Sequence, residues 1–277
     1  MTTRDDRART RGIAYPRARK RFGQHFLEPA WVTRLVDTLQ ATAGDTFLEI
    51  GPGRGALTKP LAGRAGRVIG VEVDRDLAAA LSAEMPPHVR IVEDDFLAVD
   101  LDTLLSQERR PVRVVGNLPY NISSPILFKL LHGAREGHVF SDATLMLQKE
   151  VADRITARPG SRTYGVLGVQ VGLLADVERV LTLPPGAFRP PPQVTSAVIR
   201  LRFHPPVADV GDPAVFEKLV RGVFLQRRKT LNNALRPVAA TVGADASELI
   251  DRAGLDPRRR PETLTVPEFA SLSRAVL

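Results

Sequence analysis

The sequence predicts an α/β protein with a mostly parallel sheet, followed by a small helical domain. Short apolar strands alternate with helical segments over the first two thirds of the chain, as is typical of a parallel sheet covered on both faces. After His204-Pro205-Pro206 the strand pattern ends and helical periodicity begins. We therefore expect a sheet domain at 22–206 and a helical domain at 207–277, with the two prolines as linker.

Each element of the sheet domain is predicted from its hydrophobic pattern. Apolar runs bounded by polar or glycine residues predict strands; these lie at 46–50, 67–72, 88–92, 112–116 and 144–147. Helical spacing of apolar residues predicts the helices between them; these lie at 31–39, 57–61, 77–84 and 149–155. Two late strands, 175–183 and 195–203, flank a proline-rich segment. We expect them to extend the sheet edge as a hairpin.

Composition restricts the class of protein. Of the 277 residues, 43% are hydrophobic and 25% charged, which is usual for a globular protein in water. Neither a run of apolar residues long enough to span a membrane nor an apolar signal core occurs, so we expect no membrane insertion and no secretion. The absence of cysteine excludes disulfides, thiolate zinc sites and cysteine nucleophiles. We expect a cytoplasmic monomer that needs no metal.

Positive charge is concentrated at the N-terminus. Residues 1–21 hold eight of the 39 basic residues and two of the 31 acidic ones, so they carry +6 of the net charge of +8. Such a basic segment with few apolar residues is predicted to be a flexible tail. It suits a phosphate-binding arm, with a solubilising extension or an organelle transit peptide as alternatives.

A glycine-rich turn joins the strand at 46–50 to the following helix. Gly51, Gly53 and Gly55 allow a ligand to approach the backbone closely at this point. Because Gly51-x-Gly53-x-x-Ala56 also satisfies the dinucleotide fingerprint, the turn alone does not distinguish a nicotinamide dinucleotide from another cofactor.

Three acidic residues near successive strand ends narrow that choice. Glu72 ends the second strand, where a carboxylate accepts hydrogen bonds from ribose hydroxyls. Glu49 lies two residues before Gly51, where a negative charge opposes a pyrophosphate but suits a sulfonium and an ammonium group. Asp95, after the third strand, can accept from an adenine amine, with a turn-capping role as the alternative. Together these acids favour S-adenosylmethionine over NAD.

The strand at 112–116 runs into a polar and aromatic tetrad, Asn117-Leu118-Pro119-Tyr120. An Asn side-chain carbonyl and a main-chain carbonyl can each accept a hydrogen bond from an exocyclic amine, and an aromatic face can stack on the ring that carries it. Proline lacks a backbone N–H, so the turn presents acceptors. The tetrad predicts a site for a flat ring with an amino group, the alternative being an ordinary turn.

Basic residues gather twice in the helical domain. Because the chain beyond residue 21 has a net charge of only +2, such local concentrations predict contacts with RNA phosphates, with solvated faces as the alternative. The first cluster is Arg221, Arg227, Arg228, Lys229 and Arg236; the second is Arg258, Arg259 and Arg260.

Taken in order, the motifs of this chain resemble those of the bacterial small-subunit (16S) rRNA adenine dimethyltransferases, the KsgA/RsmA family. The resemblance extends from residue 20 to the region of residue 235. It rests on the segments 20–27, 48–53, 117–123, 146–152, 188–192 and 226–231. His25 stands where the family often has Asn.

The resemblance implies a class I S-adenosylmethionine-dependent methyltransferase with a Rossmann-like fold. Its activity would be dimethylation of the exocyclic amines of two adjacent adenosines near the 3′ end of 16S rRNA, in the immature 30S subunit, with a role in ribosome biogenesis. S-adenosylhomocysteine would be the product. The residues that the resemblance places around the cofactor are Gln24, His25 and Leu27 at the methionine part, Gly51 through its backbone, Glu72 at the ribose, Asp95 and Phe96 at the adenine, and Asn117 at the boundary with the target base.

A mechanism follows from the residue types. Asn117 Oδ1 and the carbonyl of Leu118 or Pro119 would hold the amine hydrogens and favour a pyramidal nitrogen, and no general base is needed. Tyr120 and Phe188 would sandwich a base flipped out of its stack. The alternative for Phe188 is packing beneath the proline run.

Three other functions compete. A 23S rRNA adenine methyltransferase of the macrolide-resistance type shares fold, cofactor and chemistry. A ribosome-assembly factor would bind the particle with catalysis secondary. A nicotinamide oxidoreductase would bind NAD through the same glycine turn.

Overall fold

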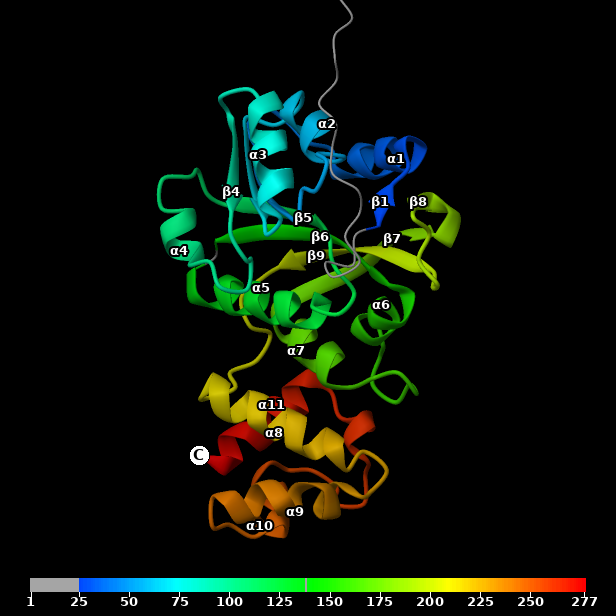
Figure 1. The fold of residues 1–277 in the computed structure, drawn as a ribbon. Helices are drawn as coiled ribbons and strands as arrows, with labels where there is room; N and C mark the ends of the chain where they lie inside the picture. Colours follow the sequence, from blue (N-terminus) through cyan, green and yellow to red (C-terminus); the bar gives the residue numbers. More distant parts are fainter. Residues whose placement is uncertain (1–24, 138) are drawn as a thin grey trace, which may run out of the picture.

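The computed structural model describes residues 25–137 and 139–277 (Figure 1). Gln24 and the basic tail at 1–21 lie outside the described residues. The strands are β1 (Phe26–Leu27), β2 (Thr46–Ile50), β3 (Arg67–Glu72), β4 (Val89–Glu93), β5 (Val112–Asn117), β6 (Phe140–Gln148), β7 (Ala175–Leu183), β8 (Phe188–Arg189) and β9 (Ser196–Phe203). The helices are α1 (Pro29–Leu39), α2 (Thr58–Ala62), α3 (Arg75–Glu84), α4 (Leu101–Leu104), α5 (Ser123–Gly137), α6 (Lys149–Ile155), α7 (Val166–Leu174), α8 (Pro213–Leu225), α9 (Leu231–Thr241), α10 (Ala246–Arg252) and α11 (Val266–Val276).

The central sheet has seven strands in the order β4-β3-β2-β5-β6-β9-β7. The neighbours from β4 to β6 pair in parallel, whereas β9 is antiparallel to both β6 and β7. The mostly parallel sheet and the antiparallel extension of its edge are therefore confirmed. Several predicted boundaries agree with the structure, but β6 begins four residues before the predicted strand at 144–147.

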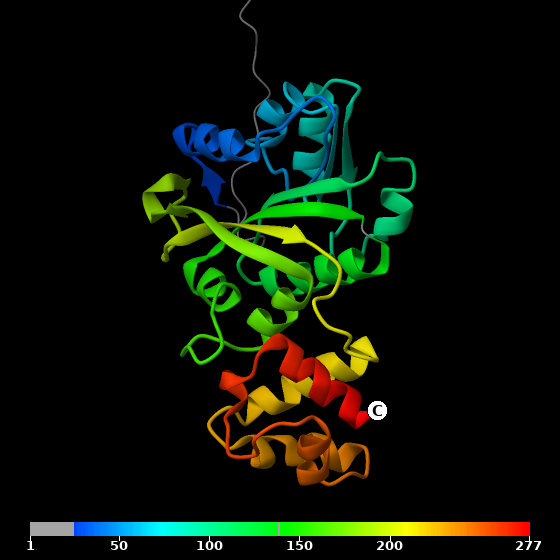
Figure 2. The same ribbon diagram turned by 180° about the vertical axis from the view of Figure 1, so that it is seen from behind.

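The two faces of the sheet are covered by different helices. Successive strand residues alternate between two buried clusters: Phe47 and Val115 pack with α1, while Leu48 and Val114 pack with α5 and α7. This alternation follows from the period of two along a strand. Figures 1 and 2 show α1 on one side of the sheet and α5 and α7 on the other.

The C-terminal segment is helical, as predicted, and its helices α8–α11 gather beyond α7 (Figures 1 and 2). Helix α8 begins where Asp212 accepts hydrogen bonds from the backbone N–H groups of Ala214 and Val215, a standard N-cap. Phe216 of α8 belongs to the same buried cluster as Leu173 of α7. The helices thus rest on the sheet domain through a continuous core, and their separation as a domain stays a prediction.

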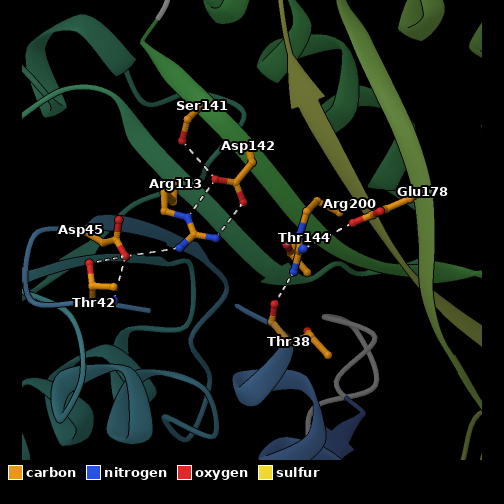
Figure 3. A network of polar contacts seen from close by, with 9 residues as sticks. All are labelled: Thr38, Thr42, Asp45, Arg113, Ser141, Asp142, Thr144, Glu178 and Arg200. Atoms are coloured by element: carbon orange, nitrogen blue, oxygen red, sulfur yellow. Dashed lines mark hydrogen bonds and ion pairs between the residues drawn. The ribbon is translucent and has the colours of Figure 1, made fainter. Parts of the chain in front are cut away.

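Two half-buried arginines connect the strands to one another and to α1 (Figure 3). Arg113, near the start of β5, donates to Asp142 of β6 at 2.8 Å and to Asp45, just before β2, at 3.3 Å. Arg200 of β9 bonds to Glu178 of β7 at 3.3 Å and to the main-chain oxygen of Thr38 at the end of α1. The Arg113 contacts fix β2, β5 and β6 at their amino ends, so the carboxyl ends of these strands stay available to form a site.

Candidate functional site

A pocket opens at the carboxyl ends of the parallel strands. The chain leaves β2 on one side to form β3 and β4, then returns to form β5 on the other side. Ligands of open α/β sheets bind at such a switch point. The pocket walls come from the ends of β2, β3, β4 and β5 and from β1, which pairs with β8. Of the residues predicted from sequence to bind the cofactor or the target base, all in the described part of the chain except Phe188 line this pocket.

The glycine turn provides a close approach to the backbone. Gly51 and Gly53 have φ of 67° and 59°, a region that favours glycine. A Cβ placed on Gly51 would have no neighbouring atom within 4 Å, so this side of the turn is open to a ligand. The N–H of Gly53 donates to Glu72 Oε2 at 2.8 Å, and α2 begins only at Thr58. The N–H of Gly53 is therefore already used by a carboxylate and is not free to donate to a phosphate.

Glu72 is held in place by the backbone. Its Oε2 accepts from Gly53 and its Oε1 accepts from the N–H of Asp74 at 2.9 Å. Burial raises the pKa of Glu72, while these hydrogen bonds act in the opposite direction. Each oxygen of a carboxylate has two lone-pair sites, so both can also accept from the adjacent hydroxyls of a ribose.

Glu49 is a buried acid in the pocket wall. It is 2% exposed, and Thr58 Oγ1 donates to its Oε2 at 2.6 Å. Burial raises the pKa of Glu49 to about 7. A positively charged ligand nearby favours the ionised form. The environment of Glu49 therefore suits a cation and disfavours a phosphate.

Asp95 and Phe96 follow β4 and line the same pocket. Asp95 Oδ1 accepts from the N–H of Leu97 at 2.9 Å, which confirms the turn-capping role. Because the residue also lies in the pocket wall, its other carboxylate oxygen can still accept from a ligand. The ring of Phe96 is 5% exposed and forms part of the core beneath.

Asn117 is oriented by a contact with the N-terminal segment. Its Nδ2 donates to the main-chain oxygen of His25 at 2.7 Å. With the amide nitrogen used in this way, Oδ1 is the atom that can accept from a ligand. Leu118, fixed by a hydrogen bond from its N–H to Met146 O at 3.2 Å, and Pro119 continue the wall.

Tyr120 is braced on one face and at its hydroxyl. The His25 ring stacks on it with centroids 5.7 Å apart and planes 23° apart, and the Tyr120 hydroxyl lies 2.7 Å from Ser196 Oγ. His25 Nδ1 in turn lies 2.8 Å from Pro190 O. One face of Tyr120 is thus occupied by His25, so a target base would stack on the other.

Phe188 does not line the pocket. It is 1% exposed and packs among Leu27, Leu183 and Val198, where β8 pairs with β1. The structure therefore does not bring it together with Tyr120 as two faces of an open slot. Its burial matches the alternative expectation of packing beneath the proline run.

Several pocket residues were missed from the sequence. They are apolar; four of them lie within the motif segments 20–27, 48–53, 117–123 and 146–152, and the fifth directly follows Glu72, which was the signal available in the sequence. These residues are Phe26, Pro52, Val73, Ile122 and Met146.

The first basic cluster divides into paired and exposed members. Arg221 forms an ion pair with Glu217 at 2.7 Å, and Arg227 pairs with Glu262 at 3.0 Å. The remaining three side chains are exposed, with no ion pair to any described residue: Arg228, Lys229 and Arg236. In the second cluster, Arg258 and Arg259 are paired within the fold.

Across 25–137 and 139–277, no group of three or more His, Cys, Asp or Glu side chains is placed to hold a metal ion. In the same part of the chain, no helix has the length and apolar character needed to cross a membrane.

Known proteins are similar to this chain over most of its length. Residues 16–274 match the family model described as ribosomal RNA adenine dimethylase. The chain is 47% identical over 263 residues to the ribosomal RNA small subunit methyltransferase A of Acinetobacter baylyi, covering 93% of this chain and 92% of the relative. It is 46% identical over 269 residues to the protein of the same name from Geobacter sulfurreducens, covering 94% and 96%.

Solved structures share the fold. A dimethyladenosine transferase from Plasmodium falciparum superposes with a TM-score of 0.73 at 24% identity, covering 90% of this chain and 96% of that one. The 23S rRNA methyltransferase ErmE superposes with a TM-score of 0.64 at 26% identity, covering 91% and 99%. The fold is thus the Rossmann-like fold of the S-adenosylmethionine-dependent methyltransferases. Because the family model spans nearly the whole chain, this protein belongs to the ribosomal RNA adenine dimethylase family.

Proposed function

We propose that this protein, an rRNA adenine methyltransferase by its family, uses S-adenosylmethionine to dimethylate two adjacent adenosines near the 3′ end of 16S rRNA. The substrate is the immature 30S subunit in the cytoplasm, and the modification belongs to ribosome biogenesis. The observation that carries the proposal is the convergence of Asn117 and Tyr120 with Glu49, Glu72 and Asp95 around one pocket.

The pocket walls fit the parts of the cofactor. Glu72 would accept from the ribose hydroxyls, and Asp95 would accept from the adenine amine beside the Phe96 ring. Glu49 and the open side of Gly51 would face the methionine part, with the main chain at His25 and Leu27 near by. This arrangement of acids opposes NAD, since the pyrophosphate of NAD would lie against Glu49.

The tetrad would prepare the target amine. Asn117 Oδ1 and the carbonyl oxygen of Leu118 or Pro119 accept its two hydrogens, which draws the nitrogen lone pair out of conjugation with the ring. When bound, S-adenosylmethionine would supply a sulfonium methyl group: the adenine nitrogen would form a bond to the methyl carbon as the carbon–sulfur bond breaks, and the leaving group would be S-adenosylhomocysteine. The methylated amine is acidic enough to lose its proton to water. Positioning and fixed dipoles would therefore supply most of the rate.

Tyr120 would hold the flipped adenine by stacking on its free face, a contact worth ~1–3 kcal/mol per base. The His25 ring supports the opposite face and keeps the tyrosine plane fixed. The exposed Arg228, Lys229 and Arg236 would contact phosphates of the rRNA around the target.

Sequence identity to named relatives is the reason for proposing the small subunit, and not the large one, as the substrate. The relatives named small subunit methyltransferase A reach 47% identity, whereas the 23S rRNA methyltransferase ErmE shares 26%. Glu72, Asp95 and Asn117 line the same pocket, which supports an enzyme over an assembly factor without catalysis.

The test uses radiolabelled S-adenosylmethionine with separately purified, unmethylated 30S and 50S subunits. Label in 16S rRNA is expected. Label in 23S rRNA instead would make the protein a large-subunit methylase. Cofactor binding without label in either RNA would leave the assembly-factor function.

A further inference from the structure

Lys129 lies on α5, the helix that follows the Asn117–Tyr120 tetrad, and it reaches across to another part of the pocket. Its Nζ donates to Leu97 O at 3.1 Å and to Val99 O. Both carbonyls belong to the turn at 94–99, between β4 and α4. An ammonium group has three donors, so one side chain can hold two main-chain oxygens at once.

The turn at 94–99 carries Asp95 and Phe96, which line the cofactor pocket. Its first half is held by its own bonds: Asp95 O accepts from the N–H groups of Ala98 and Val99, each at 2.9 Å. The carbonyls at its far end point to Lys129. The ammonium also lies 5.5 Å from the centroid of the Phe96 ring, within the range of a cation–π contact.

The charge of Lys129 is placed among acids. Asp94, Asp95 and Asp100 all favour its protonated form, while partial burial lowers its pKa. A neutral side chain here would leave three carboxylates close together around one turn, and their mutual repulsion would loosen it. Hydrogen bonding, ring contact and charge therefore all act on the same short segment.

We infer that Lys129 is a positioning residue that holds the adenine end of the cofactor pocket by fastening the turn at 94–99 to α5. Lys129 itself does not line the pocket, and none of the sequence motifs includes it. Its effect is on the placement of Asp95 and Phe96, and this inference rests on the proposed role of those two residues at the adenine.

The test compares two ligands on a Lys129→Met protein. Met keeps the length and the apolar contact with Phe96 but removes the donors and the charge. The dissociation constant for S-adenosylhomocysteine is expected to rise about tenfold. S-inosylhomocysteine, in which a carbonyl replaces the adenine amine, should bind equally weakly to both proteins, so that discrimination between the two ligands also falls about tenfold. The KM for S-adenosylmethionine should rise while kcat at saturation stays within about twofold.

Lys218→Met provides the matched control, because Lys218 is an exposed lysine on α8, away from the pocket. This control should bind both ligands as the wild type does. If Lys129→Met is poorly folded by circular dichroism, Lys129→Gln, which keeps one donor group, should show an intermediate loss of discrimination.

Unchanged affinity and discrimination in the folded variants would overturn the inference. An equal loss of affinity for both ligands would also overturn it, because it would show general loosening of the pocket. Failure of the wild type to bind S-adenosylhomocysteine would count against the proposed function, so the two failures are distinguishable.

Discussion

Asn117 Nδ2 donates to the main-chain oxygen of His25 at 2.7 Å, which joins two segments 92 residues apart in the sequence. The bond fixes the amide so that Oδ1, the acceptor needed for an adenine amine, is directed away from His25. The same histidine supports Tyr120 through its ring. The N-terminal segment therefore sets the orientation of two members of the tetrad.

Replacing Asn117 by Asp tests this orientation. A carboxylate cannot donate to His25 O, so two acceptors would face each other and the side chain would turn. We expect kcat for methyl transfer to 30S subunits to fall on the order of 100-fold, with affinity for S-adenosylhomocysteine changed less than threefold. Asn121→Asp is the control, since Asn121 is exposed nearby. Retention of wild-type kcat by Asn117→Asp would show that the amide has no such role.

Glu72→Gln should weaken cofactor binding. The amide of Gln has one acceptor oxygen, so it cannot accept from both Gly53 and Asp74 as Glu72 does. We expect the dissociation constant for S-adenosylhomocysteine to rise about tenfold or more. Calorimetric titration measures this. Glu93 pairs with Glu72 across the strands but is exposed, so Glu93→Gln is the control and should bind normally.

The pKa of Glu49, raised to about 7 by burial, predicts a pH dependence of binding. A cationic ligand requires the ionised carboxylate, so affinity for S-adenosylmethionine should rise about tenfold between pH 6 and pH 8. Binding at pH 6 should also release protons. Titrations in buffers of different ionisation enthalpy measure both effects.

Glu49→Gln is the control for the pH dependence of binding and should flatten it. A binding profile of Glu49→Gln as steep as that of the wild type would assign the dependence to another group.

The raised pKa of Glu49 also has a consequence for the stability of the fold. Between the ordinary pKa of 4.5 and about 7, the folded protein binds more protons at Glu49 than the unfolded chain does. The contribution of Glu49 to the free energy of unfolding therefore declines as pH rises through this range.

The exposed basic side chains on the C-terminal helices should act on RNA binding alone. Arg228→Ala with Lys229→Ala is expected to weaken 30S binding and to lower the slope of log affinity against log salt by about one for each phosphate that the protein no longer neutralises. Affinity for S-adenosylhomocysteine should be unchanged. Arg258→Ala is the comparison, because Arg258 pairs with Asp256. An unaltered salt slope in the double variant would remove these residues from the RNA surface.

Much of the fold could be predicted because its strands and amphipathic helices carry clear hydrophobic periods. Helix α7, which is almost entirely apolar and buried, has no such period, and α5 was missed beside the tetrad. The pairing of β1 with β8 involves strands of only two residues, which leave no pattern.

Some features of the site could also be predicted from the sequence, and others could not. The acids at strand ends could be located from the sequence because parallel strands bring their carboxyl ends to one edge. The contact of His25 with Asn117, the bond from Gly53 to Glu72 and the burial of Phe188 depend on how distant segments pack. No local pattern in the sequence encodes those contacts.

The most direct test of the central claim is nucleoside analysis of 16S rRNA after unmethylated 30S subunits are incubated with the protein and S-adenosylmethionine. We predict dimethyladenosine at two residues per particle, mapped to adjacent positions near the 3′ end, and formed on the order of 100-fold more slowly with Asn117→Asp. A 16S rRNA that stays unmodified while the cofactor binds would contradict the account, and so would dimethyladenosine found only in the 23S rRNA of 50S subunits incubated in parallel.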